Sequence, residues 1–165
     1  MCALVVENGS KPLGANAYAD VATASDYLAS RGIAAWQLAA PASQEAALIQ
    51  GADYLNGLMW RGHKLEARVM AWPRGGVVDA DGLPVAENIV PAAVVAANIE
   101  VAALIVSGSN PLAPQERGGL LSSLTVGDIS MSYAPDAPAE TIYPVVRGLL
   151  RGLLRGGACV ELSRG

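Results

Sequence analysis

One stretch decides the fold class, and it reads PAAVVAANIEVAALIV over residues 91–106. Pro91 suits the first turn of a helix, where a backbone N–H would have no partner anyway. A helix from there to about Val106 would be roughly 25 Å long at 1.5 Å per residue. Its apolar side chains fall on two adjacent stripes: Val94, Val101 and Ile105 on one, and Val95, Ile99, Ala102 and Val106 on the other. A helix that is apolar over so much of its circumference must be covered on more than one side. We therefore expect a central core helix, or one that also lines a subunit interface.

The residues on the N-terminal side of this stretch begin with a shorter helix over residues 21–31. Asp20 can cap it, because a short carboxylate accepts hydrogen bonds from the free amides of the first turn. Gly32 supplies a left-handed stop. The residues predicted to share one face are Val21, Ala24, Tyr27, Leu28 and Arg31.

A second N-terminal helix begins at Pro41 or Ser43 and runs to about Met59, with apolar residues at helical spacing. Gly51 and Gly57 lie within it. Each glycine costs about 1 kcal/mol in a helix relative to alanine. The sequence therefore predicts that another segment packs closely at these positions, or that the helix ends early.

Turn residues accumulate between residues 60 and 88, where the helical periodicity disappears. A loop of this length in a small domain is usually functional or packed down by its own side chains. Trp60 and Trp72 are the expected structural pins, because a tryptophan is more often buried in a core than offered as a stacking platform.

A β-hairpin is predicted at about residues 120–133, after a loop. Pairing residue 126 with 129, and 124 with 131, places four apolar residues on one face: Leu124, Val126, Ile129 and Met131. The intervening Gly127-Asp128 fits a type II′ turn. A two-stranded hairpin is marginally stable alone, so this face is a candidate partner or oligomer interface.

A fourth helix is expected from Val145 to about Arg155, with leucines on one side and three arginines on one stripe: Arg147, Arg151 and Arg155. The stripe is either a solvated helix face or a contact with an acidic partner surface or nucleic acid. In residues 156–165, an expected flexible tail, Val160 and Leu162 are two apart and could add a strand to a neighbouring subunit.

Together these elements predict a mainly α protein: a small four-helix domain with a protruding β-hairpin and a long packed loop. The chain has 165 residues and a mass of 16.9 kDa, which fits one domain. We expect that domain to span residues 1–155, with residues 156–165 as the tail.

The composition is unusually apolar. Hydrophobic residues make up 52% of the chain and charged residues 16%, against roughly 25% charged in an average soluble domain. Such a chain is too apolar to be disordered, yet no stretch reaches the ~18 uncharged apolar residues of a membrane span. The apolar excess favours a homo-oligomer without a membrane partner.

The N-terminus lacks the pattern of a secretory leader, so we expect the chain to stay in the cytoplasm. In that compartment Cys2 and Cys159 should be reduced.

The charge balance and the motifs exclude two classes of function. The chain has 11 basic and 15 acidic residues and a net charge of −4, which argues against a protein that grips phosphate backbones. His63 is the single histidine and lies in a predicted loop, and neither dinucleotide nor P-loop glycine patterns occur. We therefore expect no enzyme, no cofactor and no metal site.

The order of several short motifs resembles a known family. They are, in chain order, Tyr18-Ala19-Asp20-Val21, Trp36, Ala52-Asp53-Tyr54-Leu55, Trp60-Arg61-Gly62, Ala71-Trp72-Pro73-Arg74, Val90-Pro91-Ala92-Ala93-Val94, Ile129-Ser130-Met131-Ser132-Tyr133 and Tyr143-Pro144-Val145. This pattern, over residues 18–150, resembles the head-to-tail connector, or adaptor, proteins of siphophages. Relatives of those proteins often carry the label DnaT-like single-stranded DNA-binding protein.

The resemblance implies a structural virion protein in the neck of a bacteriophage, assembled in the host cytoplasm. It would form a homo-oligomeric ring, a dodecamer, that docks on the portal protein and extends the DNA channel. The ring would join the next neck or tail-completion protein, and DNA would pass through it without specific binding. The alternative is a single-stranded DNA-binding accessory protein, a function that fits an isoelectric point near 4.9 less well.

Overall fold

The computed structural model describes residues 3–112, 123–126, 129–132 and 143–155. This part of the chain is mainly α-helical, as expected, and it contains five helices: α1 (Val21–Ala29), α2 (Ala34–Leu38), α3 (Pro41–Asn56), α4 (Ala92–Val106) and α5 (Pro144–Leu149). Its strands form two antiparallel pairs: β1 (His63–Lys64) with β2 (Arg74–Gly75), and β3 (Ser123–Val126) with β4 (Ile129–Ser132). The expected count of four helices is wrong, because the residues around Trp36 form a short helix as well.

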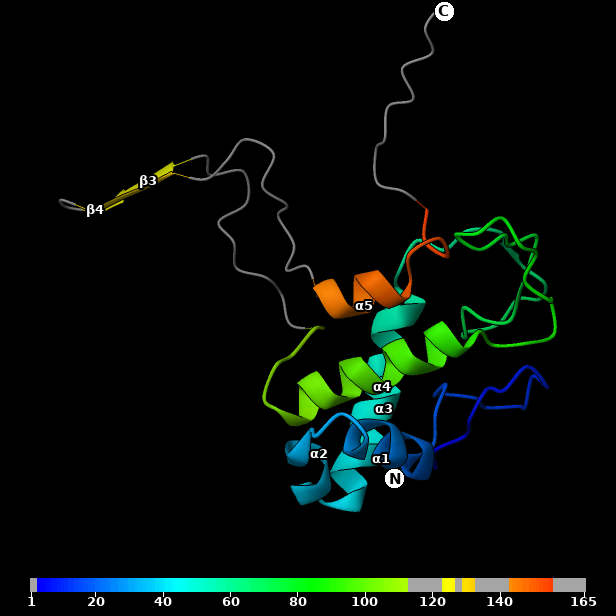
Figure 1. Ribbon diagram of the computed structural model, residues 1–165, viewed down its shortest axis with the longest axis horizontal. Coiled ribbons are helices and arrows are strands. Elements are labelled where there is room, and N and C mark those ends of the chain that lie inside the picture. Colours follow the sequence, from blue (N-terminus) through cyan, green and yellow to red (C-terminus); the bar gives the residue numbers. More distant parts are fainter. Residues whose placement is uncertain (1–2, 113–122, 127–128, 133–142, 156–165) are drawn as a thin grey trace, which may run out of the picture.

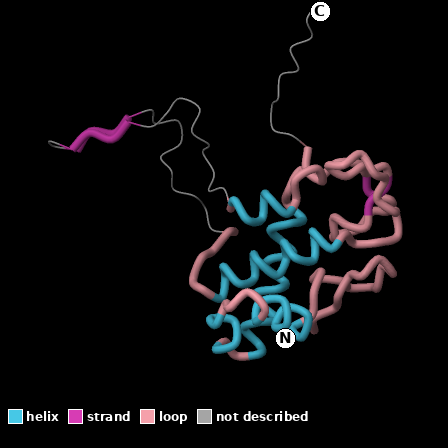
Figure 2. The backbone as a smooth tube through the Cα atoms, in the orientation of Figure 1, coloured by secondary structure: helices cyan, strands magenta, loops and turns pink. Residues whose placement is uncertain are grey.

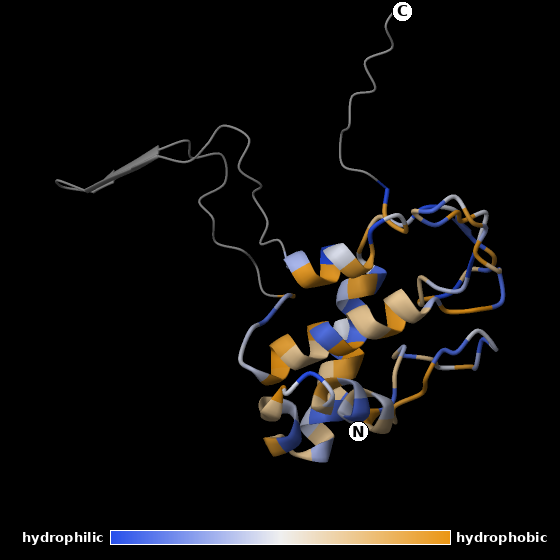
Figure 3. Cartoon of the chain, viewed as in Figure 1, coloured by the Kyte–Doolittle hydropathy of each residue, from blue (hydrophilic) through white to orange (hydrophobic). Residues whose placement is uncertain are grey.

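Helix α4 lies at the centre of the fold. It contacts α1, α2, α3 and α5, and Figure 1 shows it crossing α3 between α5 and the α1–α2 pair. One side of α4 packs in a cluster with Trp60 and Trp72, and another side packs in a second cluster with Leu28 and Trp36. Figure 3 shows the helix mostly in hydrophobic colours. The prediction of a central helix covered on more than one side is confirmed.

A buried polar contact joins α3, α4 and the segment before α1. Asn98 of α4 is fully buried. Its Oδ1 accepts a hydrogen bond from the Tyr18 amide and its Nδ2 donates to the Leu48 carbonyl, both at 2.9 Å. A Cβ atom added at Gly51 would lie 2.8 Å from Asn98 Nδ2. The close packing predicted at Gly51 is therefore present, whereas Gly57 takes the other predicted role and ends α3.

Contacts between residues close in sequence define both ends of α1 and the turn into α2. Asp20 Oδ1 accepts a hydrogen bond from the Thr23 amide at 2.7 Å, so the predicted N-cap of α1 is confirmed. Helix α1 ends at Ala29, before the expected residue 31, and Gly32 turns the chain with a φ of 69°. The turn leads directly into α2, where Trp36 is fully buried and its Nε1 donates to Ser25 Oγ at 3.0 Å.

Residues 57–91 form the long loop that the sequence predicts, and Figure 2 shows them as loop with the short β1–β2 pair. Trp60 and Trp72 are both buried in it, with ring centroids 5.6 Å apart and nearly perpendicular planes. The Tyr18 hydroxyl donates to Asn56 Oδ1 at 2.7 Å and accepts a hydrogen bond from the Ala71 amide at 2.9 Å. These contacts attach the loop to α3 and to the segment before α1.

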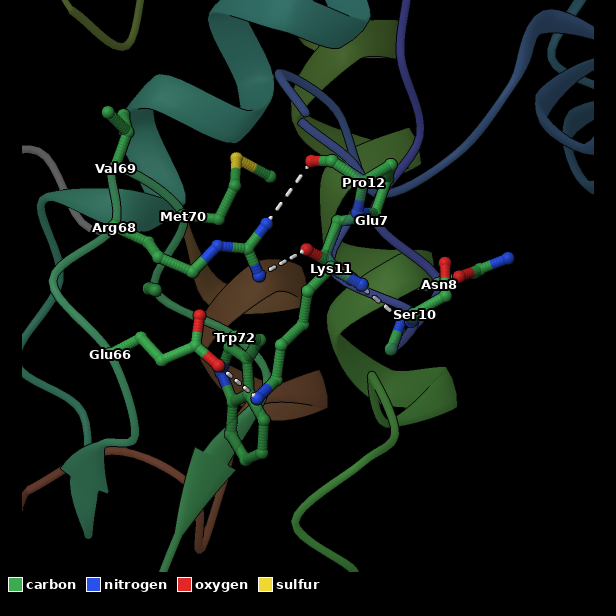
Figure 4. A network of polar contacts seen from close by, with 12 residues as sticks. Glu7, Asn8, Ser10, Lys11, Pro12, Glu66, Arg68, Val69, Met70 and Trp72 are labelled. Atoms are coloured by element: carbon green, nitrogen blue, oxygen red, sulfur yellow. Dashed lines mark hydrogen bonds and ion pairs between the residues drawn. The ribbon is translucent and has the colours of Figure 1, made fainter. Parts of the chain in front are cut away.

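The N-terminal segment is attached to the same loop by charged side chains (Figure 4). Glu7 is fully buried and its Oε2 lies 2.9 Å from Arg68 Nη1, while Oε1 accepts hydrogen bonds from the amides of Gly9 and Lys11. Lys11 Nζ lies 2.6 Å from Glu66 Oε1. Two ion pairs thus join segments that are more than fifty residues apart in the sequence.

Helix α5 is shorter than expected. It ends at Leu149, whereas the sequence predicts a helix to about Arg155. Gly152 has a φ of 89°, and a Cβ atom there would lie 2.6 Å from the Ala80 amide nitrogen. This backbone conformation is incompatible with an α-helix, so the predicted helical stripe through Arg151 and Arg155 is wrong as a description of local structure.

The β3–β4 hairpin has the predicted register. Val126 pairs with Ile129 and Leu124 pairs with Met131. The segments that join it to the helices, residues 113–122 and 133–142, lie outside the described residues, as does the expected tail at 156–165 with Val160 and Leu162.

Candidate functional site

A groove of about 720 Å³ lies beside α5 and the C-terminal end of α3. Figure 1 shows α5 next to this end of α3. The residues that line the groove are Tyr54, Leu58, Arg61, Tyr143, Pro144, Val146, Arg147, Gly148, Leu150, Arg151, Gly152, Leu154 and Arg155. Four of them are arginines, and among the described residues none that lines the groove is acidic. We call this set the arginine groove.

Two segments that are distant in the sequence form one side of the arginine groove. Trp60 and Leu154 make an isolated antiparallel bridge. Beside it, the Arg61 amide donates to the Leu153 carbonyl at 2.9 Å, and the Arg155 amide donates to the Met59 carbonyl at 2.8 Å. Backbone pairing therefore brings Arg61 and Arg155 to the same groove.

The arginine groove concentrates positive charge. The described part of the chain contains nine lysines and arginines, and the groove holds four of these nine: Arg61, Arg147, Arg151 and Arg155. All four are exposed to solvent. Like charges gathered in one cleft raise the local concentration of anions. The groove is thus suited to an anionic ligand with several charges.

The stem of Arg61 is held in position. Its Nε donates to the Leu154 carbonyl at 3.1 Å, in addition to the backbone bond of the same residue. Fixing the guanidinium in this way lowers the entropy that a ligand contact would cost, because fewer rotamers must be given up on binding. Arg61 is therefore partly pre-positioned for a ligand contact.

A further arginine, Arg74, does not line the groove but interacts electrostatically with one of its arginines. Arg74 is buried and its guanidinium donates to the carbonyls of Arg61, Gly62 and Ala71. Burial lowers the pKa of Arg74, and the nearby charge of Arg155 lowers it further.

Aromatic and aliphatic side chains complete the lining. The rings of Tyr54 and Tyr143 meet edge to face, with centroids 5.9 Å apart and planes at 89°. Tyr54 comes from α3 and Tyr143 directly precedes α5. The aliphatic lining residues are Leu58, Val146, Leu150 and Leu154. The arginine groove therefore offers apolar surface as well as positive charge.

The structure brings together only some of the residues singled out from sequence. Arg147, Arg151 and Arg155 share the groove, although a turn and a bridge place the last two rather than a helix. Leu124, Val126, Ile129 and Met131 lie in the hairpin strands β3 and β4. Val160 and Leu162 lie outside the described residues. Trp60 and Trp72 lie in the core.

Of the groove-lining residues, the sequence marked only Arg147, Arg151 and Arg155 as candidates, and it missed the others, among them Tyr54, Arg61 and Tyr143. Arg61 is more than eighty residues from the other groove arginines in the sequence, so no helical spacing links it to them. Only the pairing of residues 59–61 with 153–155 brings it to the other arginines, and that pairing leaves no periodic signal in the sequence.

Two other kinds of site were sought in the described ranges. No group of three or more histidine, cysteine or acidic residues lies close enough to hold a metal ion there. Within the same ranges, no helix combines the length and the apolar character that crossing a membrane would demand.

Comparison with known proteins identifies the family. The family model described as "Putative DnaT-like ssDNA binding protein" matches residues 2–165, which is nearly the whole chain. The chain therefore belongs to this family. Among curated proteins and among solved structures, no significant match to the chain is found.

This match overturns the function that the connector resemblance implied. The matching family is described by single-stranded DNA binding, not by a place between phage head and tail, so the prediction of a head-to-tail connector is wrong. The finding supports the alternative function instead. The expected ring of twelve copies and the portal partner followed from the connector resemblance, and they stay untested predictions.

Proposed function

We propose that this chain binds single-stranded DNA and that the arginine groove is the binding site. The observation that carries the proposal is the gathering of four arginines in one groove, without an acidic neighbour among the described lining residues, in a protein of this family. Proteins that bind single strands without sequence preference combine a cationic groove that follows the backbone with aromatic side chains beside it. The arginine groove has both components.

The guanidinium group suits the phosphate backbone. It presents several N–H donors in a planar fork that can contact two phosphate oxygens at once, and it stays charged at any physiological pH. Such contacts carry no base information. We therefore expect binding of single strands with little dependence on sequence.

The net charge of −4 does not oppose this function. Salt screens charges beyond about 8 Å at physiological ionic strength, so a phosphate in the groove responds mainly to the arginines next to it. Glu7, Glu66 and Glu100 are paired with cations that lie outside the groove, so these pairs do not use the groove arginines. The sequence-based argument used the average charge, whereas this proposal rests on how the charges are distributed.

Charge reversal in the groove tests the proposal. The variant Arg147→Glu/Arg151→Glu should bind a fluorescent thymidine oligomer at least about tenfold more weakly at ~0.1 M salt, as fluorescence anisotropy would measure, because two phosphate contacts become repulsive. The control, Arg31→Glu/Lys64→Glu, makes the same change in net charge at residues that do not line the groove. An equal loss in both variants, or no binding by the unmodified protein, would contradict the proposal.

A further inference from the structure

The arginine groove combines its positive charges with an apolar surface. Its lining includes two tyrosines and four aliphatic residues beside the arginines, and this apolar surface has no role in contacting phosphate. A ligand that covers it must carry an apolar or aromatic face together with its negative charge. A nucleotide with an unpaired base has both.

We infer that the groove takes an unpaired base out of water, with the base against Tyr143 and the aliphatic lining, and with its phosphates on the arginines. This inference rests on the proposed function and specifies how a single strand is held. Every base has an aromatic face, so stacking on a tyrosine is tolerant of sequence.

Tyr143 is placed firmly enough to act as this platform. It precedes Pro144, whose ring fixes the backbone at the start of α5. Its ring is also braced by the edge-to-face contact with Tyr54 of α3. A ring held from two elements loses little freedom when a base packs on it, which favours binding.

The same surface gives a reason for selecting single strands over duplex DNA. Bases in a duplex are paired and stacked, and extruding one costs a few kcal/mol. A duplex could reach the arginines with its phosphates but could not cover the apolar lining without paying that cost. The inference therefore predicts that single strands of equal phosphate number bind more tightly than duplex.

An abasic oligomer separates the base contact from the phosphate contact. A thymidine 12-mer and an abasic 12-mer have the same phosphates, so the intact protein should bind the abasic oligomer about tenfold more weakly. This comparison uses the unmodified chain, and its result does not depend on how any variant folds.

Variants at Tyr143 then assign the base contact to this residue. Tyr143→Ala should weaken binding of the thymidine oligomer and reduce the difference between the two oligomers, while Tyr143→Phe should preserve both. Tyr27→Ala, at a tyrosine that does not line the groove, should leave the ratio of the two affinities unchanged. Circular dichroism establishes that each variant is folded.

The outcomes distinguish this inference from the proposed function. Equal affinity for the two oligomers would overturn the base contact and leave single-stranded DNA binding through phosphate intact. No binding of either oligomer would overturn the proposed function itself. A thymidine preference that persists in Tyr143→Ala would overturn the assignment to Tyr143.

Discussion

Two groups of positive side chains in the described part of the chain have different surroundings. Lys11 and Arg68 face Glu66 and Glu7 across the N-terminal segment and the long loop (Figure 4). In the part of the chain that the structure describes, no acidic residue lines the groove beside its arginines. A cation paired within the chain stabilises the fold, whereas cations gathered without acids are available to an external anion. The two groups should therefore respond in opposite ways to substitution.

The largest effect on stability is expected at Arg68. Replacing it by methionine would leave the fully buried carboxylate of Glu7 without its counter-charge. Breaking a buried pair in this way lowers the free energy of unfolding by about 3–5 kcal/mol, which urea denaturation would measure. Binding of a single-stranded oligomer by the remaining folded protein should be unchanged.

Lys11→Met is the matched control for Arg68→Met. Its partner Glu66 has a side chain that is 53% exposed, and exposed pairs contribute about 1 kcal/mol or less. A loss at Arg68 no larger than the loss at Lys11 would show that burial does not distinguish the two pairs.

A smaller effect should appear at high pH, through the buried tyrosine that attaches the long loop. Burial raises the pKa of Tyr18 from 10.0 to about 12. In the unfolded chain the phenol loses its proton near pH 10, but in the folded chain it keeps the proton to higher pH. Stability should therefore fall as the pH rises from about 10 to about 12, by about 2–3 kcal/mol in total.

Urea denaturation at several pH values between 9 and 12 would measure this loss. Tyr18→Phe should be less stable at pH 9, since Asn56 and the Ala71 amide lose a hydrogen-bond partner, but it should lose less with rising pH. Parallel pH profiles for the two proteins would show that another group is responsible.

Much of the fold could be predicted from the sequence, because the signals were local. The two apolar stripes of α4, the Asp20 cap and the hairpin register depend on residues close together in the chain. The end of α5 could not be predicted, since the conformation of Gly152 is tied to Ala80, about seventy residues away. Helix α2 has five residues, too few for a periodic pattern to emerge.

The candidate site could be predicted only in part, for the same reason. Arg147, Arg151 and Arg155 are evenly spaced, so the sequence marks them as a group even though they do not share one helix. Arg61 joins them because its neighbour Trp60 forms a backbone bridge with Leu154 and its own amide donates to the Leu153 carbonyl. Net charge could not reveal the groove, because it averages over residues that the fold separates.

The salt dependence of binding tests the central claim most directly. The logarithm of the affinity for single strands falls with the logarithm of the salt concentration, with a slope of about −0.7 per phosphate contact. Four groove arginines therefore predict a slope of about −3 for the unmodified protein. Arg147→Gln or Arg151→Gln should each reduce its magnitude by about 0.7, and Lys64→Gln should leave it unchanged. A slope near zero, or one that these two groove substitutions do not alter, would contradict the account.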